Sequence, residues 1–186
     1  MFANTPVDIA REIFEEASIE HRPKDLLPCD SLNSEQRSTY DEIMAAVYNN
    51  RGGLFFYGPG GTGKTFLYRA LLAKLRSRNK LVVPTATSEV AASIMPGERT
   101  THSHFKIPLT LEDGASCSFT KQCGTAKLPQ EAALIIWDEA SMTKRQAVKA
   151  LDNSLRDIMG RTDLLFGEKS TSPPEQFYLH IMIGST

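Results

Sequence analysis

The stretch Gly58-Pro-Gly-Gly-Thr-Gly-Lys-Thr65 decides the fold of this 186-residue chain. It follows the apolar run Leu54-Phe-Phe-Tyr57, which predicts a buried strand, and it opens into residues 66–75, whose leucines and alanines predict a helix. A strand, a glycine-rich loop and a helix in this order give G-x-x-x-x-G-K-[ST] the context of a phosphate-binding loop. The alternative is a flexible glycine loop, but the flanking elements favour nucleotide binding.

Each residue of this loop has a role in holding a triphosphate. Backbone N–H groups of glycines converge on phosphates without side chains in the way, and the helix N-terminus adds the positive end of its dipole. Lys64 can reach the β- and γ-phosphates of ATP, and the Thr65 hydroxyl can ligate Mg²⁺. The predicted nucleotide-binding residues in the loop are Gly58, Gly60, Gly61, Thr62, Gly63, Lys64 and Thr65.

The rest of the chain alternates between apolar runs and amphipathic segments. Strands are expected at residues 54–57, 81–87 and 132–137, with a local irregularity at Pro84, and helices at 33–48, 64–78, 88–95 and 141–159. Asn33 and Gln36 have the spacing of a capping box at the start of the first of these helices. Residues 96–108 are expected to be a loop, and residues 109–130 a loop with short structured pieces. Strands that alternate with helices predict an α/β fold with a parallel sheet.

Two acids follow the third apolar run. Asp138 stands at the carboxyl end of that strand, which is where open parallel sheets bind ligands, and it suits a magnesium ligand that acts directly or through water. Glu139 could accept a proton from an attacking water. The alternative is a pair of solvated acids before a helix N-terminus.

Composition restricts the partners and the cellular compartment. The formal net charge is −1 and the sequence pI is about 6.4, so there is no overall basic surface for nucleic acid, although a local groove remains compatible with these values. Cys29, Cys117 and Cys123 match no zinc spacing and are expected to be reduced. No apolar stretch approaches the ~20 residues of a membrane span. We expect an intracellular protein without a membrane partner, in the nucleus or alternatively the mitochondrion.

Taken together, the motifs resemble the first RecA-like domain of the Pif-type DNA helicases of superfamily one. The resemblance covers roughly residues 32–169, and its longer runs resemble the plant branch of the family. It implies a RecA-like, P-loop NTPase sheet, the cofactors ATP and Mg²⁺, 5′-to-3′ unwinding of DNA at single strands and forks, and roles in DNA repair and recombination. The segments that carry it are Leu32–Gln36, Gly58–Thr65, Thr85–Ser88, Thr101–Phe105 and Trp137–Met142.

The resemblance also implies roles for individual residues. Lys64, Asp138 and Glu139 would be catalytic, with Thr65 and Asp138 at the metal. Gln36 would hydrogen-bond the adenine, with the capping box as the alternative. The single-strand path would be lined by Thr87, His102, Ser103 and Phe105, although Phe105 could equally be a core aromatic, and His102 and His104 are expected to be solvated loop residues.

Two departures from the family pattern stand out. Glu89 replaces a glycine beside the expected DNA path, which disfavours phosphate contacts there. After Lys169 the match stops, so the strand expected between the loop-bearing strand and the Asp138 strand is missing, together with a second RecA-like domain and its arginine. Residues 177–183 could substitute for that strand; the alternative is a tail without a place in the fold. The expected organisation is an acidic extension (1–31), a partial RecA-like domain (32–169) and a divergent tail (170–186).

Three functions remain open at this point. The first is the nucleotide-binding half of an ATP-dependent DNA helicase, with weak or no activity by itself. The second is a non-catalytic fragment that binds ATP or a partner. The third is a P-loop ATPase or kinase outside the helicases, which Gln36 and the run Asp138-Glu-Ala-Ser-Met142 disfavour.

Overall fold

The computed structural model describes residues 13–15, 31–49, 55–58, 61–93, 99–110, 115–119, 123–160, 162–163, 166 and 181–184. In this part of the chain, five strands form two parallel ladders, in the orders β1-β5 and β3-β2-β4. The parallel α/β fold predicted from the sequence is confirmed. The strands are β1 (Phe55–Gly58), β2 (Val82–Ala86), β3 (Arg99–Thr100), β4 (Leu134–Asp138) and β5 (Ile181–Gly184).

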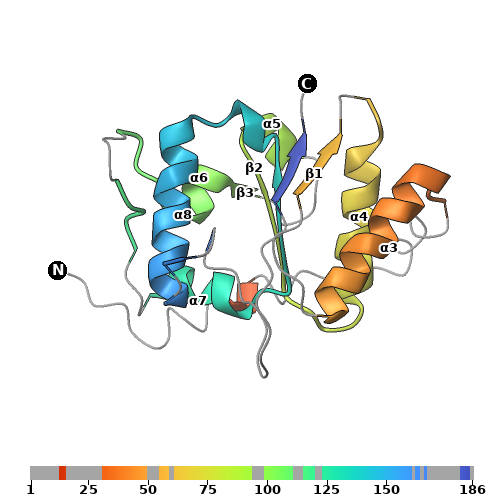
Figure 1. The fold of residues 1–186 in the computed structure, drawn as a ribbon, viewed down its shortest axis with the longest axis horizontal. Helices are drawn as coiled ribbons and strands as arrows, with labels where there is room; N and C mark the ends of the chain where they lie inside the picture. The colour runs from red at the N-terminus through yellow and green to blue at the C-terminus, as the bar shows by residue number, and fades with distance from the viewer. Residues whose placement is uncertain are drawn as a thin grey trace.

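Helices cover both faces of the sheet (Figure 1). One face carries α3 (Ser34–Asn49) and α4 (Lys64–Arg76), and the other carries α6 (Thr101–His104), α7 (Gly124–Glu131) and α8 (Arg145–Met159). Two short elements, α5 (Glu89–Ala92) and η2 (Ala140–Met142), lie at the carboxyl ends of β2 and β4. No helix in the described ranges is long and apolar enough to cross a membrane.

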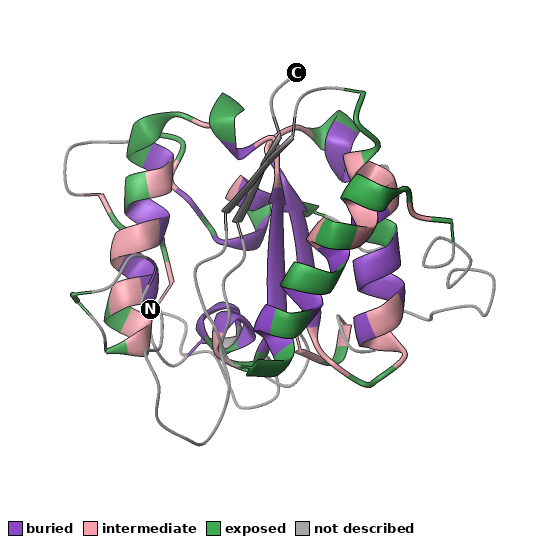
Figure 2. Ribbon diagram, turned by 45° about the vertical axis from the view of Figure 1, so that its right-hand side comes forward, coloured by how far each residue is buried: buried purple, intermediate pink, exposed green. Residues whose placement is uncertain are grey.

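The alternation of side chains along a strand divides the interior into two cores. Leu134 and Ile136 of β4 pack with the buried side chains of α3 and α4 in the first core. Ile135 and Trp137 point the other way, into a second core with α6, α7 and α8. Consequently β2 and β4 are buried on both faces, as Figure 2 shows, and they read as continuous apolar runs in the sequence.

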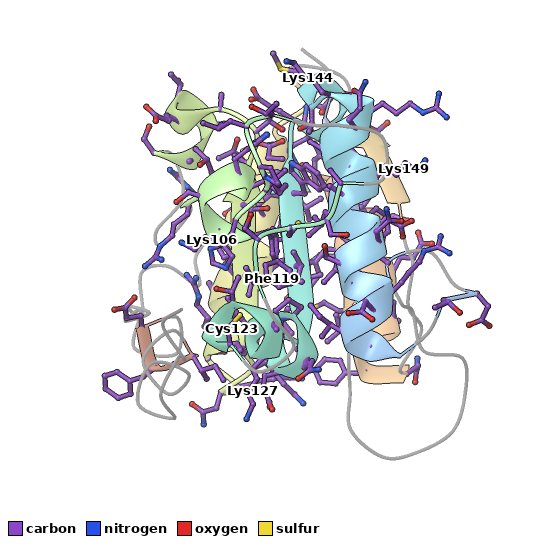
Figure 3. All side chains as sticks on the ribbon, turned by 90° about the vertical axis from the view of Figure 1, so that its left-hand side faces the viewer. Lys106, Phe119, Cys123, Lys127, Lys144 and Lys149 are labelled. Carbon is purple, nitrogen blue, oxygen red and sulfur yellow. The ribbon has the colours of Figure 1, made fainter. Side chains whose placement is uncertain are left out.

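The α8 layer follows helical periodicity. Its buried residues recur at spacings of three and four, and the helix ends at Gly160, whose φ of 65° is left-handed. Figure 3 looks onto this layer, where Phe119 lies between α6 and α8 and is partly buried against the second core. Lys144 and Lys149 lie on its solvent side. The buried residues of α8 are Ala147, Ala150, Leu151, Ser154 and Leu155.

Several local expectations need correction. The β2–β4 register runs through Pro84 without interruption, because the ladder with β3 begins only at Thr85, and a proline is tolerated where its neighbour strand is absent. The segment 109–130, expected to be a loop with short pieces, ends in the short helix α7, whereas the loop expected at 96–108 contains β3 and α6. These pieces are short and polar, so tertiary packing rather than periodicity determines them. The helix expected from residue 141 begins at Arg145, after η2.

The strand pair with the largest separation in sequence includes the last described segment of the chain. Residues 181–184 form β5, which pairs in parallel with β1 from Phe55↔Ile181 to Gly58↔Gly184. On its other side β5 lies against β4 (Figure 1), although among the described residues its ladder joins it to β1 alone. Of the hypothesis of a substitute central strand, the pairing with the P-loop strand is confirmed for residues 181–183, whereas no ladder among the described residues joins β5 to β4, and residues 177–180 lie outside the described part.

Candidate nucleotide-binding site

The described part of the glycine-rich loop has the backbone of a phosphate-binding turn. Gly61 and Gly63 both have φ of +77°, a left-handed conformation that glycine adopts without strain. The Gly63 carbonyl accepts the N–H groups of Phe66 at 3.0 Å and Leu67 at 3.3 Å, so α4 begins directly after it. Gly58 ends β1, and Gly60 lies outside the described residues. The strand–loop–helix context predicted from the sequence is confirmed.

Gln36 joins α3 to this loop. Its Oε1 accepts the Asn33 N–H at 3.1 Å while Asn33 Oδ1 accepts the Gln36 N–H at 2.8 Å, which confirms the capping box. Its Nε2 donates to the carbonyl oxygens of Thr62 at 3.2 Å and Gly63 at 3.4 Å. A Cβ on residue 63 would lie 2.5 Å from that Nε2, so glycine there makes room for the contact. Both ends of the Gln36 amide are engaged by the chain, and its adenine role stays a prediction.

Asp138 faces the phosphate-binding loop. As an even-numbered residue of β4 it points to the α4 side of the sheet, where the buried Tyr68 hydroxyl donates to its Oδ1 at 3.4 Å. The Glu139 N–H also donates to Oδ1, at 2.9 Å. Burial raises the pKa of Asp138, while the Glu139 N–H and the nearby Lys64 ammonium act to lower it. Lys64 and Asp138, 74 positions apart in sequence, thus act on one another across the site.

The donor set at this place fits magnesium. Thr65 offers a hydroxyl in the first turn of α4 and Asp138 a carboxylate, and both are oxygen ligands of the type Mg²⁺ prefers. The Tyr68 hydroxyl and the Glu139 N–H both donate to Oδ1 of the Asp138 carboxylate. In the described ranges, no three His, Cys, Asp or Glu residues gather into a metal-binding group. An ion that takes few protein ligands and keeps its waters suits this set.

Glu139 adopts an unusual backbone conformation. Its φ of 56° and ψ of 29° are left-handed, which costs a non-glycine residue about 1 kcal/mol or more. Such residues persist where the surrounding structure holds them, and they cluster at functional sites. Its Oε2 accepts the Ser88 hydroxyl at 2.9 Å. Hence the two adjacent acids diverge: Asp138 turns to α4, and Glu139 turns to the residue that caps α5.

Thr87 holds the backbone beside these acids. Its N–H donates to the Asp138 carbonyl at 3.1 Å, and its hydroxyl donates to the Glu139 carbonyl at 2.8 Å. The same hydroxyl oxygen accepts the Trp137 indole N–H at 3.1 Å and lies 2.7 Å from Thr143 Oγ1. One donor and two acceptor positions are thereby all used. The end of β2 is fastened to the end of β4 through one side chain.

The residues expected along a DNA strand do not all lie at the surface. Ser103 is exposed and His102 half-buried, so both could meet a strand. Phe105 is only 1% exposed and packs in the second core, so its ring cannot stack on a base in this conformation and the core-aromatic alternative holds. His104 is also buried rather than solvated, with both ring nitrogens lacking a partner in the described part of the chain. Burial lowers its pKa to about 3.

Sequence reasoning missed two side chains of the site. Tyr68 lies one helical turn after Lys64, on the same face of α4, and this spacing was the signal that could have placed it near the phosphates. Ser88 stands at the start of the helix expected at 88–95, and it caps α5 by accepting the Ala91 N–H at 3.2 Å. Its second bond, to Glu139, depends on the β2–β4 register and leaves no trace in the local sequence.

The parallel sheet, the glycine-rich loop and the acid at the end of β4 define a P-loop nucleotide-binding protein with a partial RecA-like domain. The family model described as PIF1-like helicase matches residues 31–171, and this chain belongs to that family.

Known relatives are much longer than this sequence. The chain is 28% identical over 134 residues to the ATP-dependent DNA helicase PIF4 of Trypanosoma brucei brucei, covering 70% of this chain and 16% of that protein. It is 30% identical over 129 residues to the ATP-dependent DNA helicase dda of Enterobacteria phage T4, covering 66% and 28%. A Bacteroides Pif1 helicase in complex with ADP-AlF3 and ssDNA superposes with a TM-score of 0.59 at 24% identity, covering 82% and 32%. The chain therefore spans less than a third of each.

Proposed function

We propose that this chain is the nucleotide-binding half of an ATP-dependent DNA helicase. The proposal rests on the approach of α4, which follows the glycine-rich loop, to Asp138 at the end of β4. Two observations show this approach: the hydrogen bond from the Tyr68 hydroxyl to Asp138, and the effect of the Lys64 charge on the pKa of that carboxylate. A triphosphate held by the loop would place its γ-phosphate between Lys64 and Asp138.

Each residue then has one task. Backbone N–H groups of Gly61, Thr62 and Gly63 cradle the phosphates, and Lys64 neutralises them. Thr65 and Asp138 would hold Mg²⁺, and the bound ion would supply positive charge against the transferred phosphoryl group. Glu139 accepts the proton of the attacking water.

DNA is the second proposed ligand. Family membership supports 5′-to-3′ unwinding, single-stranded and forked DNA as substrates, and roles in DNA repair and recombination. Thr87, His102 and Ser103 lie at or near the carboxyl ends of β2 and β3, on the segments that follow those strands. We propose that a single strand passes there. With a net charge of −1, the chain would bind it through a local groove.

For these 186 residues alone we propose nucleotide binding with little unwinding. In the family an arginine from a second RecA-like domain completes the site, and such an arginine is typically worth roughly 10³–10⁵ in rate. A non-catalytic, ATP-binding role is the second candidate, and β5 favours it because it gives the P-loop strand a partner within this chain. Robust strand displacement by the purified chain would refute the proposal of weak activity.

Calorimetric titration with Mg-ATP tests the nucleotide site. Lys64→Ala should weaken binding at least about tenfold, or ~1.4 kcal/mol, because it removes a charge from the phosphates. Lys74→Ala, in the last turn of the same helix, is the matched control and should bind like the wild type. Thermal unfolding of each variant checks folding. If folded wild-type chain gives no heat with Mg-ATP, the nucleotide site does not exist.

Hydrolysis with and without single-stranded DNA separates the two candidates. Stimulation of even a slow rate by an oligothymidylate indicates the helicase half. A rate that DNA does not change indicates the passive binder.

A further inference from the structure

We infer that Ser88 is a positioning residue that restrains Glu139 away from the nucleotide, and that a DNA strand releases the restraint by competing for the Ser88 hydroxyl. The inference rests on the proposed function, in which Glu139 is the base and DNA passes Thr87. It concerns the hydrogen bond from Ser88 Oγ to Glu139 Oε2 at 2.9 Å, which none of the roles above requires.

The position of Ser88 in the fold determines the direction in which Glu139 is held. β4 lies between β5 and β1 on one side and β2 on the other, and Ser88 follows β2. The Glu139 carboxylate is therefore drawn across the carboxyl end of the sheet, away from the strand that leads into the P-loop. Asp138 points the opposite way, to Tyr68 of α4. A general base must come within hydrogen-bond reach of the water it activates, and here one of its oxygens is already occupied on the far side.

Hydrogen bonds fix the main-chain conformation of Glu139. Its left-handed φ of 56° is secured by the Thr87 hydroxyl on its carbonyl at 2.8 Å and by the Met142 N–H on the same oxygen at 2.9 Å. Since the main chain is fixed at that residue, rotation of the side chain is the remaining freedom. One hydrogen bond from Ser88 then decides where the carboxylate lies.

The chemistry of serine supplies the release. A serine hydroxyl has a single proton to donate, and here it goes to Glu139, while its oxygen accepts the Ala91 N–H. A phosphate oxygen of a DNA strand at the neighbouring Thr87 would compete as the acceptor of this hydrogen bond. When the Ser88 hydroxyl donates to the phosphate instead, the Glu139 carboxylate is free to turn to the nucleotide, and the cap of α5 is kept. DNA binding would thereby switch on hydrolysis without moving the P-loop.

The test compares two affinities. Mg-ADP does not need the base, whereas Mg-ADP with aluminium fluoride imitates the transition state and does. The ratio of the two dissociation constants, measured by calorimetry on the full chain with and without an oligothymidylate, reports how well Glu139 is placed. In the wild type the oligonucleotide should raise the preference for the aluminium fluoride complex.

Three substitutions separate the restraint from the cap. Ser88→Ala loses both functions, Ser88→Asp keeps a good cap acceptor but cannot donate to Glu139, and Ser88→Thr keeps both. Without DNA, the alanine and aspartate variants should raise the preference roughly 5- to 10-fold, the scale of one hydrogen bond, and DNA should add nothing further. The threonine variant should behave like the wild type.

A second mutation identifies the group on which Ser88 acts. In a Glu139→Gln background the effect of Ser88→Ala should vanish, because the restrained carboxylate is gone. The inference is overturned if the ratio of dissociation constants is unchanged in all Ser88 variants, or if the effect of Ser88→Ala survives in Glu139→Gln. It is also overturned if Ser88→Asp matches the wild type while Ser88→Ala does not. A wild type without DNA dependence also overturns it. Failure of folded wild type to bind Mg-ADP removes the proposed function itself, and is distinguishable from these outcomes.

Discussion

The two halves of the sheet are held together in different ways. β2 and β4 pair over five residues, from Val82↔Leu134 to Ala86↔Asp138, and side chains add to the ladder: Thr85 Oγ1 donates to the Ile136 carbonyl at 2.9 Å. β1 pairs over four residues with β5, a segment from the other end of the sequence. The half that carries the acids thus joins segments 52 positions apart (Val82 to Leu134), whereas the half that carries the P-loop joins segments 126 positions apart (Phe55 to Ile181).

This difference has a consequence for the site. Lys64 and Asp138 belong to different halves, and a nucleotide needs both at once. The loss of loop entropy on closing a distant pair must be offset before that pair stabilises the fold, so β1–β5 should form late and open first. We expect the geometry of the nucleotide site to follow the integrity of β5.

Breaking β5 should have the largest effect. Met182→Pro removes a backbone N–H and introduces a ring clash in a strand that lies between β1 and β4, which should cost about 3 kcal/mol or more of unfolding free energy. Met182→Ala, which keeps the backbone donor, is the control. Urea unfolding measures the loss. Hydrogen exchange should show fast amides in β1 and slow amides in β2 and β4, and a proline variant with wild-type stability would argue against a central β5.

The second prediction concerns the opposite half. Burial is the main cause that lowers the pKa of His104 to about 3, and the nearby positive charges of Arg99 and Lys106 act in the same direction. The unfolded chain takes up a proton near pH 6.5 and the folded chain does not until about pH 3, so stability is full above pH 6.5 and falls as the pH drops below it. At pH 5 this should cost the wild type about 2 kcal/mol relative to neutral pH.

His104→Leu should remove that pH dependence. It also replaces two ring nitrogens that lack partners in the described part of the chain with apolar atoms, so it should not destabilise the protein at pH 7. His102→Gln, on the same short helix, controls for the change in histidine number. Urea unfolding at pH 7 and pH 5 is the measurement. If wild type and His104→Leu lose equal stability between these values, the histidine is not buried as described.

A third change tests the fastening between β2 and β4. Thr87→Val keeps the shape and removes the hydroxyl that serves the Trp137 indole and the Glu139 carbonyl, which should cost about 1–3 kcal/mol by leaving buried polar groups unsatisfied. Thr87→Ser, which keeps the hydroxyl, should cost less. Trp137 is the only tryptophan of the sequence, so its fluorescence reports the change directly. An unchanged emission maximum in Thr87→Val would contradict the indole bond.

The sequence predicted well the parts of the molecule whose chemistry is local. The P-loop strand and helix, the capping box at Asn33 and the acid at the end of β4 each depend on neighbours within a few residues. Apolar runs identified β2 and β4 because both faces of these strands are buried.

The remaining features depend on register and burial, which local patterns do not encode. Phe105 reads equally as a surface stacking residue or as core, and only packing against Trp137 and its neighbours in the second core decides between them. The burial of His104 and the Ser88–Glu139 bond likewise arise from segments brought together by the sheet. The helix α7 is short and contains Pro129, so the sequence alone favoured a loop with short pieces over this segment.

The smallest effect should come from two glycines in the P-loop that share one backbone conformation. Gly61→Ala and Gly63→Ala both place a side chain at φ +77°, and each should cost about 1 kcal/mol in stability. Their surroundings differ: a Cβ at residue 61 meets nothing within 4 Å, whereas one at residue 63 lies 2.5 Å from Gln36 Nε2. The long Gln36 side chain can move, so the added methyl should displace its amide from the loop carbonyls rather than unfold the protein.

Gly61→Ala and Gly63→Ala should differ in nucleotide affinity although their stabilities are similar. If the Gln36 bridge holds the loop in its binding shape, Gly63→Ala should bind Mg-ATP more weakly than Gly61→Ala, by a factor of roughly 3–5, the value of one modest hydrogen bond. In a Gln36→Ala background the two alanine variants should become equal, because there is no amide left to displace. A difference that persists in that background would mean that residue 63 itself meets the phosphate, and that α3 contributes packing to this half of the sheet without shaping its loop.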